Sequence, residues 1–319
     1  MLTYLQAVVI GLMQGVSELF PVSSLGHSVL VPAWIGGSWQ DLVTQSSTSS
    51  SGSSPYLAFI VALHVATALA LIIFFRADWV RIISGFFRTL GPSLAARRIV
   101  TSDADERLAW LIVIATIPVG ITGLLLEHTF RVLFAKPLAA AILLTINGLI
   151  LLAGERLRKN APVDDPEHDG QLPEARSVPK AVDAAESPPR PTRRLVTLQY
   201  REASIIGLFQ TLALLAGISR SGIAMVGGLV RGLSHRDAAR FSFLLATPVI
   251  LAAGVLKLPS LAGSAGDNIR GQVLVGSVVA GCAAYATVRW LTRYFETHTL
   301  IPFAVYCLIA GALSIVKFA

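Results

Sequence analysis

Long apolar runs separated by short polar segments dominate the chain. Six of these runs approach or reach the ~20 residues that a helix needs to cross a bilayer. They predict transmembrane helices over residues 56–75, 108–126, 137–156, 238–258, 271–291 and 300–318. We therefore expect an all-α polytopic integral membrane protein.

The apolar segment at residues 2–35 differs from these runs because polar residues and a proline interrupt it. Each of its two pieces is about fifteen residues long, which is short for a complete crossing. A re-entrant helix-loop-helix accommodates such pieces if protein or a water-filled cavity surrounds its non-helical tip. A cleaved signal peptide is disfavoured, because no Lys or Arg precedes the apolar run.

A second interrupted segment, at residues 201–232, repeats the pattern of the first. When residue 11 is aligned with residue 207, six of the twenty positions from 11 to 30 are identical. Paired broken helices in the two halves of a membrane protein indicate its binding site, since freed backbone N–H groups can hold a charged ligand there. We expect the functional site where the two loops meet.

Each interrupted segment precedes three predicted spans, and this odd number of crossings would turn the second copy upside down. The sequence thus predicts an inverted repeat whose halves are residues 1–158 and 197–319. Residues 159–196 form the linker between them. Seven prolines, many charges and few bulky apolar residues in this linker predict a disordered cytoplasmic segment.

Composition agrees with a bilayer protein and narrows its topology. The chain is 54% hydrophobic and only 14% charged, whereas soluble proteins carry about 25% charged residues. The net charge of +7 does not indicate nucleic-acid binding, because the basic residues lie in loops between the spans. Their excess at residues 76–107 and 157–201 predicts that these loops are cytoplasmic and that both termini face outward.

Glu18 is the first candidate for chemistry. It lies four residues after Gln14, so on a helix both side chains share one face. An intramembrane carboxylate is costly and indicates function; the alternative is a helix-end glutamate that reaches the interface. As a ligand, Glu18 would suit Mg²⁺ or Ca²⁺, which prefer oxygen donors, and as a base it could deprotonate a neighbour.

Ser23, Ser24 and His27 follow at the start of a second half-helix. Helix capping explains one of the two serines. His27 lies three residues beyond Ser24, within reach of its hydroxyl, which is the nucleophile and base arrangement of covalent catalysis. The alternative is a neutral histidine that bonds a backbone carbonyl.

Arg220 is flanked by Ser219 and Ser221 inside the second broken helix. A guanidinium with adjacent hydroxyls and a helix N-terminus matches phosphate oxygens. The alternative is a structural ion pair with Glu18. For two further polar residues within the spans, His64 and Asn147, helix-packing hydrogen bonds are favoured over catalysis.

These motifs resemble those of the undecaprenyl-diphosphate phosphatases linked to bacitracin resistance. Residues 14–27 are similar to the first motif of that family and residues 217–222 to its second, and the resemblance covers nearly the whole chain. Two residues depart from the second motif: Ala216 replaces the usual Pro, and Ala224 replaces the usual Thr. The loss of that threonine hydroxyl puts one phosphate or helix contact in doubt.

The resemblance implies a bacterial plasma-membrane phosphatase that removes the terminal phosphate of undecaprenyl diphosphate at the outer face. By position, Glu18, Ser24, His27 and Arg220 match the family's active-site residues. The remaining polar residues of the two motifs are candidates for substrate binding: Gln14, Ser23, Ser219 and Ser221. Gln14 replaces the commoner first glutamate, which leaves Glu18 as the one carboxylate of this motif for a divalent cation.

Three questions stay open at the level of sequence. The nucleophile is Ser24, with His27 as its base, or else His27 itself or a water. A transporter or scramblase of an anionic prenyl lipid is the alternative function, because inverted repeats with opposed broken helices are a transporter architecture. The membrane lipid and the polyprenyl diphosphate are the expected partners, and whether the chain forms a homodimer is undetermined.

Overall fold

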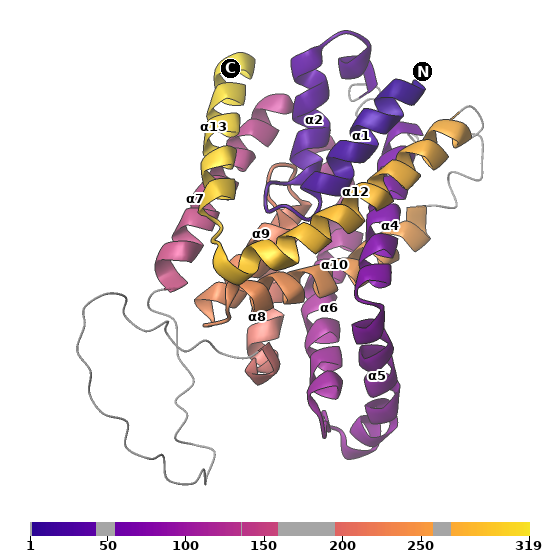
Figure 1. The fold of residues 1–319 in the computed structure, drawn as a ribbon, viewed down its shortest axis with the longest axis vertical. Coiled ribbons are helices and arrows are strands. Elements are labelled where there is room, and N and C mark those ends of the chain that lie inside the picture. The colour runs from indigo at the N-terminus through magenta and orange to yellow at the C-terminus, as the bar shows by residue number, and fades with distance from the viewer. Residues whose placement is uncertain (1, 43–54, 135, 159–194, 258–268) are drawn as a thin grey trace.

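The computed structural model describes residues 2–42, 55–134, 136–158, 195–257 and 269–319. All regular elements in these ranges are helical (Figure 1). The Ser-rich segment 46–54 and nearly all of the predicted linker lie outside the described residues. The N- and C-termini lie at the same end of the molecule (Figure 1).

The described elements follow one another as α-helices with two short 3₁₀ turns. In chain order they are α1 (Tyr4–Ser17), α2 (Ser24–Ile35), α4 (Pro55–Phe74), α5 (Arg76–Ala96), α6 (Ala104–Phe134), α7 (Pro137–Leu157), η3 (Leu195–Thr197), α8 (Tyr200–Gln210), η4 (Thr211–Leu214), α9 (Arg220–Val230), α10 (His235–Lys257), α12 (Arg270–Thr297) and α13 (Ile301–Phe318).

Five described helices, α6, α7, α10, α12 and α13, are long and apolar enough to cross a membrane. A sixth span is available if α4 and α5 are counted together, although the chain bends by 88° between them. By contrast, α1, α2 and α9 are apolar but short. The protein is therefore an all-α polytopic membrane protein, as the sequence predicts.

Two predicted loops are helical instead. The basic segment after residue 75 forms α5, whose charges are grouped by helical spacing: Arg81 pairs with Asp78, and Arg88 pairs with Glu106 of α6 at 2.5 Å. The second predicted loop, at residues 127–136, is mostly the end of α6, which runs to Phe134. The number of charges in the segment predicted a loop, because a count does not show whether the charges lie on one face of a helix.

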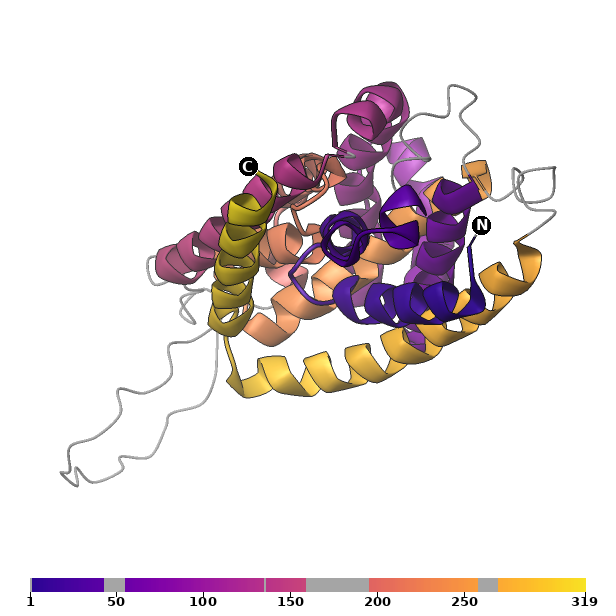
Figure 2. The same ribbon diagram turned by 90° about the horizontal axis from the view of Figure 1, so that it is seen from above.

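The helices pack in pairs that join the two halves of the chain. α7 lies along α13, and α1 lies along α12, as Figures 1 and 2 show. α6 packs on α8 and α4 on α10. Every one of these pairs combines a helix from before residue 158 with one from after residue 197, so the halves form one body rather than two domains.

The aligned glycines Gly11 and Gly207 have the same packing role. A Cβ on Gly11 would lie 2.5 Å from the carbonyl oxygen of Gly276 in α12, and one on Gly207 would lie 2.2 Å from that of Ala115 in α6. Such close backbone contact is the usual way in which membrane helices associate. Figure 1 also shows α1 and α2 at the upper end and α8 at the lower end. These features agree with an inverted repeat, which stays a prediction.

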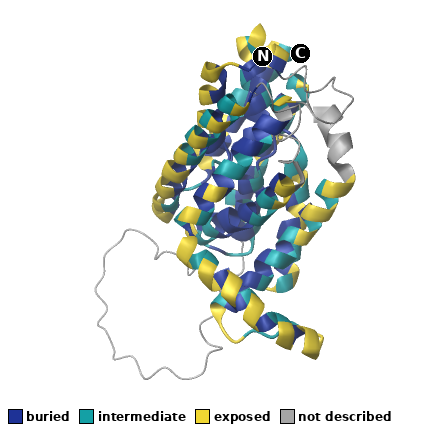
Figure 3. Cartoon of the chain, turned by 90° about the vertical axis from the view of Figure 1, so that its right-hand side faces the viewer, coloured by how far each residue is buried: buried dark blue, intermediate teal, exposed yellow. Residues whose placement is uncertain are grey.

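Buried and exposed residues separate as expected for a protein surrounded by lipid. Buried residues fill the interior of the bundle, and exposed residues line its outer helices (Figure 3). Many of the exposed side chains are large and apolar, including Leu149, Leu274, Ile309 and Val316. In contact with acyl chains such side chains carry no hydrophobic penalty, so the polar groups in the interior are the unusual feature.

Candidate active site

The two interrupted segments meet inside the bundle, as their repeat predicts. The backbone N–H of Gly217 donates to Ser23 Oγ at 3.1 Å. The Ser221 hydroxyl donates to the carbonyl oxygen of Phe20, also at 3.1 Å. These bonds join loops that are almost 200 positions apart.

The backbone of both loops is held in conformations that few residues adopt. Ser23 has a φ of 70°, and its hydroxyl also accepts from the Gly26 N–H, which caps α2. Gly217 has a φ of 116°, and a Cβ there would lie 2.6 Å from the carbonyl oxygen of Ala140. Glycine is therefore required at position 217, and the strain at Ser23 is of the kind that accumulates at functional sites.

Asn147 of α7 binds both loops. Its Nδ2 donates to the carbonyl oxygen of Pro21 at 2.9 Å, and its Oδ1 accepts from the Ser219 N–H at 2.9 Å. The side chain is completely buried. The predicted packing bonds of Asn147 therefore hold the two loops in register.

Glu18 is the centre of the polar cluster. Its Oε1 pairs with Arg220 Nη2. Its Oε2 accepts from the Ser24 hydroxyl at 2.5 Å and from Gln14 Nε2 at 2.9 Å. The carboxylate is buried, so these donors replace the water that it would otherwise need.

His64 of α4 also faces Glu18, although its sequence context favoured a packing role. Its Nε2 lies 3.2 Å from Glu18 Oε2, and its Nδ1 lies 2.8 Å from the carbonyl oxygen of Ile60. Two acceptors around one imidazole favour the doubly protonated, cationic ring. The rule that an ionisable group inside a membrane is functional by default would have identified it.

Arg220 is the first residue of α9 and approaches Glu18 from the second half of the chain. Its Nη1 also donates to the carbonyl oxygen of Ala246 in α10 at 3.4 Å. Ser219 caps α9 by accepting from the Gly222 N–H at 3.1 Å. A guanidinium at a helix N-terminus is a favourable place for an anion.

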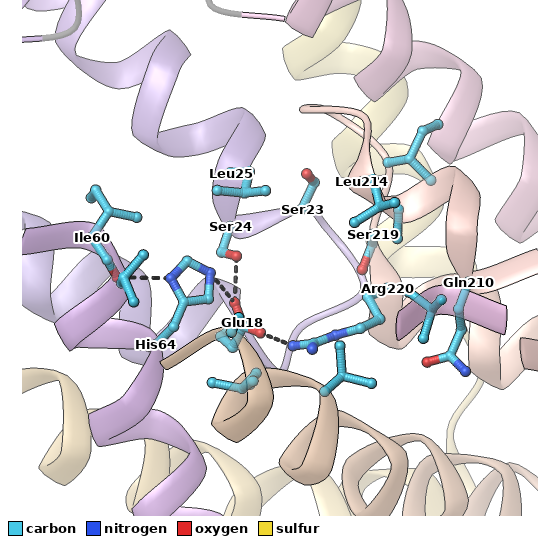
Figure 4. Close-up of a pocket in the computed structure, with 17 residues that line it drawn as sticks. Glu18, Ser23, Ser24, Leu25, Ile60, His64, Gln210, Leu214, Ser219 and Arg220 are labelled. Carbon is cyan, nitrogen blue, oxygen red and sulfur yellow. Dashed lines mark hydrogen bonds and ion pairs between the residues drawn. The ribbon is translucent and has the colours of Figure 1, made fainter. Parts of the chain in front are cut away.

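A cavity of about 250 Å³ opens beside this cluster (Figure 4). Its polar lining comes from Glu18, Ser23, Ser24, His64, Gln210, Ser219 and Arg220. The rest of the lining is apolar and comes mainly from α4, α6, η4 and α10, including Ile60, Val119, Leu214, Val249 and Ile250. The cavity thus combines a cluster of charged and polar groups with a largely apolar lining.

The ring nitrogens of His27 bond groups other than the Ser24 hydroxyl. Its Nδ1 lies 2.7 Å from the Ser23 carbonyl oxygen, and its Nε2 lies 2.7 Å from the Tyr306 hydroxyl of α13. The imidazole also stacks on the Tyr306 ring, and His27 is not among the residues that line the cavity. The contact with the Ser23 carbonyl corresponds to the alternative in which His27 bonds a backbone carbonyl. The Ser24 hydroxyl donates to Glu18 instead.

The four predicted substrate-binding residues fall into two groups. Ser23 and Ser219 line the cavity, and each of these hydroxyls also caps a helix. Gln14 and Ser221 do not line it and instead support Glu18 and the Phe20 carbonyl. Tyr306 and Gln210 were not among the predicted site residues.

The donor set fits a divalent cation only in part. No group of three or more His, Cys, Asp or Glu side chains that could hold a metal ion occurs in the described ranges. Both Glu18 oxygens already contact protein donors, among them a guanidinium. The protein side chains alone therefore do not form a cage for Mg²⁺ or Ca²⁺, which take six or more oxygen ligands.

Comparison with known proteins agrees with the motifs. Residues 7–313 match the family described as bacitracin resistance protein BacA. The chain is 61% identical to undecaprenyl-diphosphatase 2 of Frankia alni, with 100% of this chain and 98% of the relative covered. It is 57% identical to undecaprenyl-diphosphatase of Mycolicibacterium paratuberculosis, with 100% and 98% covered. A more distant relative, undecaprenyl-diphosphatase 2 of Chromobacterium violaceum, is 39% identical, with 98% and 97% covered.

Proposed function

Because the chain belongs to the bacitracin resistance protein BacA family, we propose that it hydrolyses undecaprenyl diphosphate to undecaprenyl phosphate and inorganic phosphate. This reaction recycles the lipid carrier of cell-wall synthesis. The observation that carries the proposal is the contact of Ser24 and Arg220 with one carboxylate, Glu18, in a cavity whose other lining residues are mostly apolar.

Arg220 and the N-terminus of α9 bind the diphosphate in this proposal. Two guanidinium N–H groups contact Glu18 and the Ala246 carbonyl oxygen, and the others remain for phosphate oxygens. His64 adds positive charge on the other side of Glu18. Fixed positive groups that face a transferring phosphoryl group stabilise the charge of its transition state.

Ser24 is the proposed nucleophile and Glu18 its base. Ser24 Oγ attacks the terminal phosphorus, and its proton passes to Glu18 Oε2, 2.5 Å away. The bond from phosphorus to the bridging oxygen breaks, and that oxygen leaves with the electron pair on undecaprenyl phosphate. The leaving oxygen takes the proton from Glu18 as the product departs.

Water completes the reaction. It attacks the phosphorus of the phosphoserine and gives a proton to Glu18, and the bond to Ser24 Oγ breaks. The serine oxygen then takes that proton from Glu18, which restores the starting state. Inorganic phosphate is released, and the sum is one substrate and one water giving two products.

We also propose a divalent cation, whose coordination would be completed by phosphate groups of the substrate. Mg²⁺ in phosphoryl-transfer sites is usually held by one or two carboxylates together with substrate phosphates. Glu18 would supply the carboxylate, and the ion would add positive charge beside the diphosphate. None of the steps above depends on it.

The cavity size supports a substrate that is only partly enclosed. Its volume of about 250 Å³ is below the ~300–1,000 Å³ of sites that enclose a drug-sized ligand. The diphosphate and the adjoining part of the prenyl chain would occupy it, and the rest of the chain would lie among lipids. The bacterial plasma membrane, with the site open to the outside, is the proposed location.

Hydrolysis by the purified protein in detergent tests the function. Detergent removes the two compartments that a transporter needs, so release of inorganic phosphate from undecaprenyl diphosphate can come only from an enzyme. We expect release by the wild type and none above background by Ser24→Ala. Equal release by both proteins would mean that the activity comes from a contaminant or from another residue.

A further inference from the structure

Among the polar residues that line the cavity, Gln210 is the one whose side chain neither takes part in the reaction above nor caps a helix. It is the last residue of α8, and its side chain is completely buried. Neither its Nε2 nor its Oε1 has a hydrogen-bond partner among the residues that the structure describes. It lines the same cavity as Glu18, Ser24 and Arg220.

A buried amide without partners is costly. Leaving a buried donor or acceptor unsatisfied costs a protein the full desolvation penalty of that group. Leucine has a similar size and would fill the same position without this cost. A buried, unpartnered amide that faces a substrate cavity therefore indicates that a ligand supplies the missing partners.

The repeat shows what kind of partner this is. Gln14 is the residue aligned with Gln210, and its Nε2 donates to a carboxylate oxygen of Glu18, four residues later, at 2.9 Å. The position four residues after Gln210 is Leu214, which has no such oxygen. The second copy of the repeat thus lacks the anionic oxygen that the protein provides for Gln14. Of the two aligned glutamines, only Gln210 lines the cavity.

The position of Gln210 relative to the charged groups further limits the class of ligand that its amide can bind. In Figure 4, Arg220 lies between Glu18 and Gln210. Glu18 and Ser24, where the phosphoryl group is attacked, are on one side of the guanidinium and Gln210 is on the other. Ser24, Gln210 and Arg220 line one cavity, so a diphosphate bound in it is the anionic ligand that the Gln210 amide faces.

We propose that the Gln210 amide binds the phosphate groups of the diphosphate substrate and of the inorganic phosphate product, a role that rests on the proposed phosphatase function. Nε2 donates to an anionic phosphate oxygen. Oε1 accepts from a P–OH group or from the water that enters for the second step. Gln210 is then a substrate-binding residue that contacts the phosphate groups.

Two substitutions test this proposal. Gln210→Leu removes both polar atoms at nearly constant size, and Gln210→Glu keeps the shape but places a carboxylate against phosphate. Gln272→Leu is the matched control, because that amide donates to the Leu2 carbonyl oxygen far from the cavity. For each protein, KM and kcat with undecaprenyl diphosphate and Ki for inorganic phosphate are measured, together with Tm in detergent with and without phosphate.

For Gln210→Leu we expect KM and the phosphate Ki to rise about tenfold or more, as for loss of a hydrogen bond to a charged group. Its Tm without phosphate should equal or exceed that of the wild type, since an unpartnered amide has been replaced by an apolar group. The rise in Tm that a given phosphate concentration gives the wild type should become smaller. Gln210→Glu should bind phosphate more weakly still, and Gln272→Leu should keep both constants.

Values of KM and Ki within twofold of the wild type for Gln210→Leu would overturn the proposal. A lower Tm together with unchanged constants in the folded fraction would do the same, because it would make Gln210 a packing residue. If the wild type released no phosphate, the proposed function would fail. The effect of inorganic phosphate on Tm would still decide whether Gln210 binds phosphate.

Discussion

Asn147 accepts a hydrogen bond from the Ser219 backbone N–H, and through its other amide atom it donates to the loop that carries Glu18. One side chain on α7 therefore joins the loop after Glu18 to the loop before Arg220, in addition to the two hydrogen bonds that the loops make with each other. In the proposed reaction Asn147 would be a positioning residue that touches none of the reacting atoms.

Asn147→Leu tests this positioning role. The change leaves the Ser219 N–H without its partner and leaves the Pro21 carbonyl with only the weak thiol donor of Cys307 at 3.9 Å. An unsatisfied buried group costs about 1–3 kcal/mol. We expect a clearly lower Tm and a large loss of kcat in the protein that remains folded. Thr145→Val on the same helix removes only a bond to the carbonyl of Ala141 and serves as the control. Normal kcat in folded Asn147→Leu would mean that the loops hold their register without it.

Ser24 and Glu18 should behave as a single unit in mutant kinetics. Ser24→Ala and Glu18→Gln are each expected to lower kcat by about a thousandfold or more, and the double variant should be no worse than the singles. His27→Ala should cost less and act through stability, because His27 bonds Ser23 and Tyr306. Tyr306→Phe should then have an effect of the same kind. A larger loss of kcat for His27→Ala than for Glu18→Gln would return the role of base to His27.

Arg220→Lys separates charge from geometry. An ammonium keeps the positive charge but has three N–H donors instead of five and no planar fork, so it cannot bind phosphate bidentately while it also contacts Glu18 and the Ala246 carbonyl. We expect kcat/KM to fall by about a hundredfold while the folded fraction in detergent is kept. A variant with near-normal kcat/KM would show that Arg220 only balances the charge of Glu18.

Cysteine labelling tests the inverted topology. In a Cys282→Ser background, with Cys307 buried, single cysteines are placed at Ser50 and Ala175. A membrane-impermeant maleimide added to intact cells should label residue 50 and leave residue 175 unlabelled until the membrane is broken. Labelling of both sites in intact cells would exclude the predicted arrangement.

Chelation tests the divalent cation. If substrate phosphates complete the coordination of the ion, a chelator should raise KM or abolish turnover without lowering the Tm of the substrate-free protein. Added Mg²⁺ or Ca²⁺ should restore the activity. Unchanged kinetics would remove the ion from the site, whereas a lower Tm of the substrate-free protein would mean that the protein alone binds it.

The sequence predicts the parts of this site that repeat or that are costly in a membrane. The alignment of residues 11 and 207 predicted that the loops meet, and the cost of charge in lipid pointed to Glu18 and Arg220. Helical spacing puts His27 within reach of Ser24, but in the structure its ring bonds the Ser23 carbonyl and the hydroxyl of Tyr306, a residue 279 positions away. No local pattern contains that contact. The same is true of His64, whose neighbour Glu18 comes from another helix.

The contact between Glu18 and Arg220 also has a consequence for how the chain is made. The two residues are 202 positions apart, so the carboxylate is synthesised long before Arg220, and until then its charged neighbour in the bundle is His64 of α4. A carboxylate at depth in a bilayer is costly and needs a partner. The segment of α1 and α2 should therefore depend on α4 for its charge balance while the second half of the chain is still being made. Insertion of α9 would then add Arg220, and the charged cluster would be complete only at that stage of synthesis.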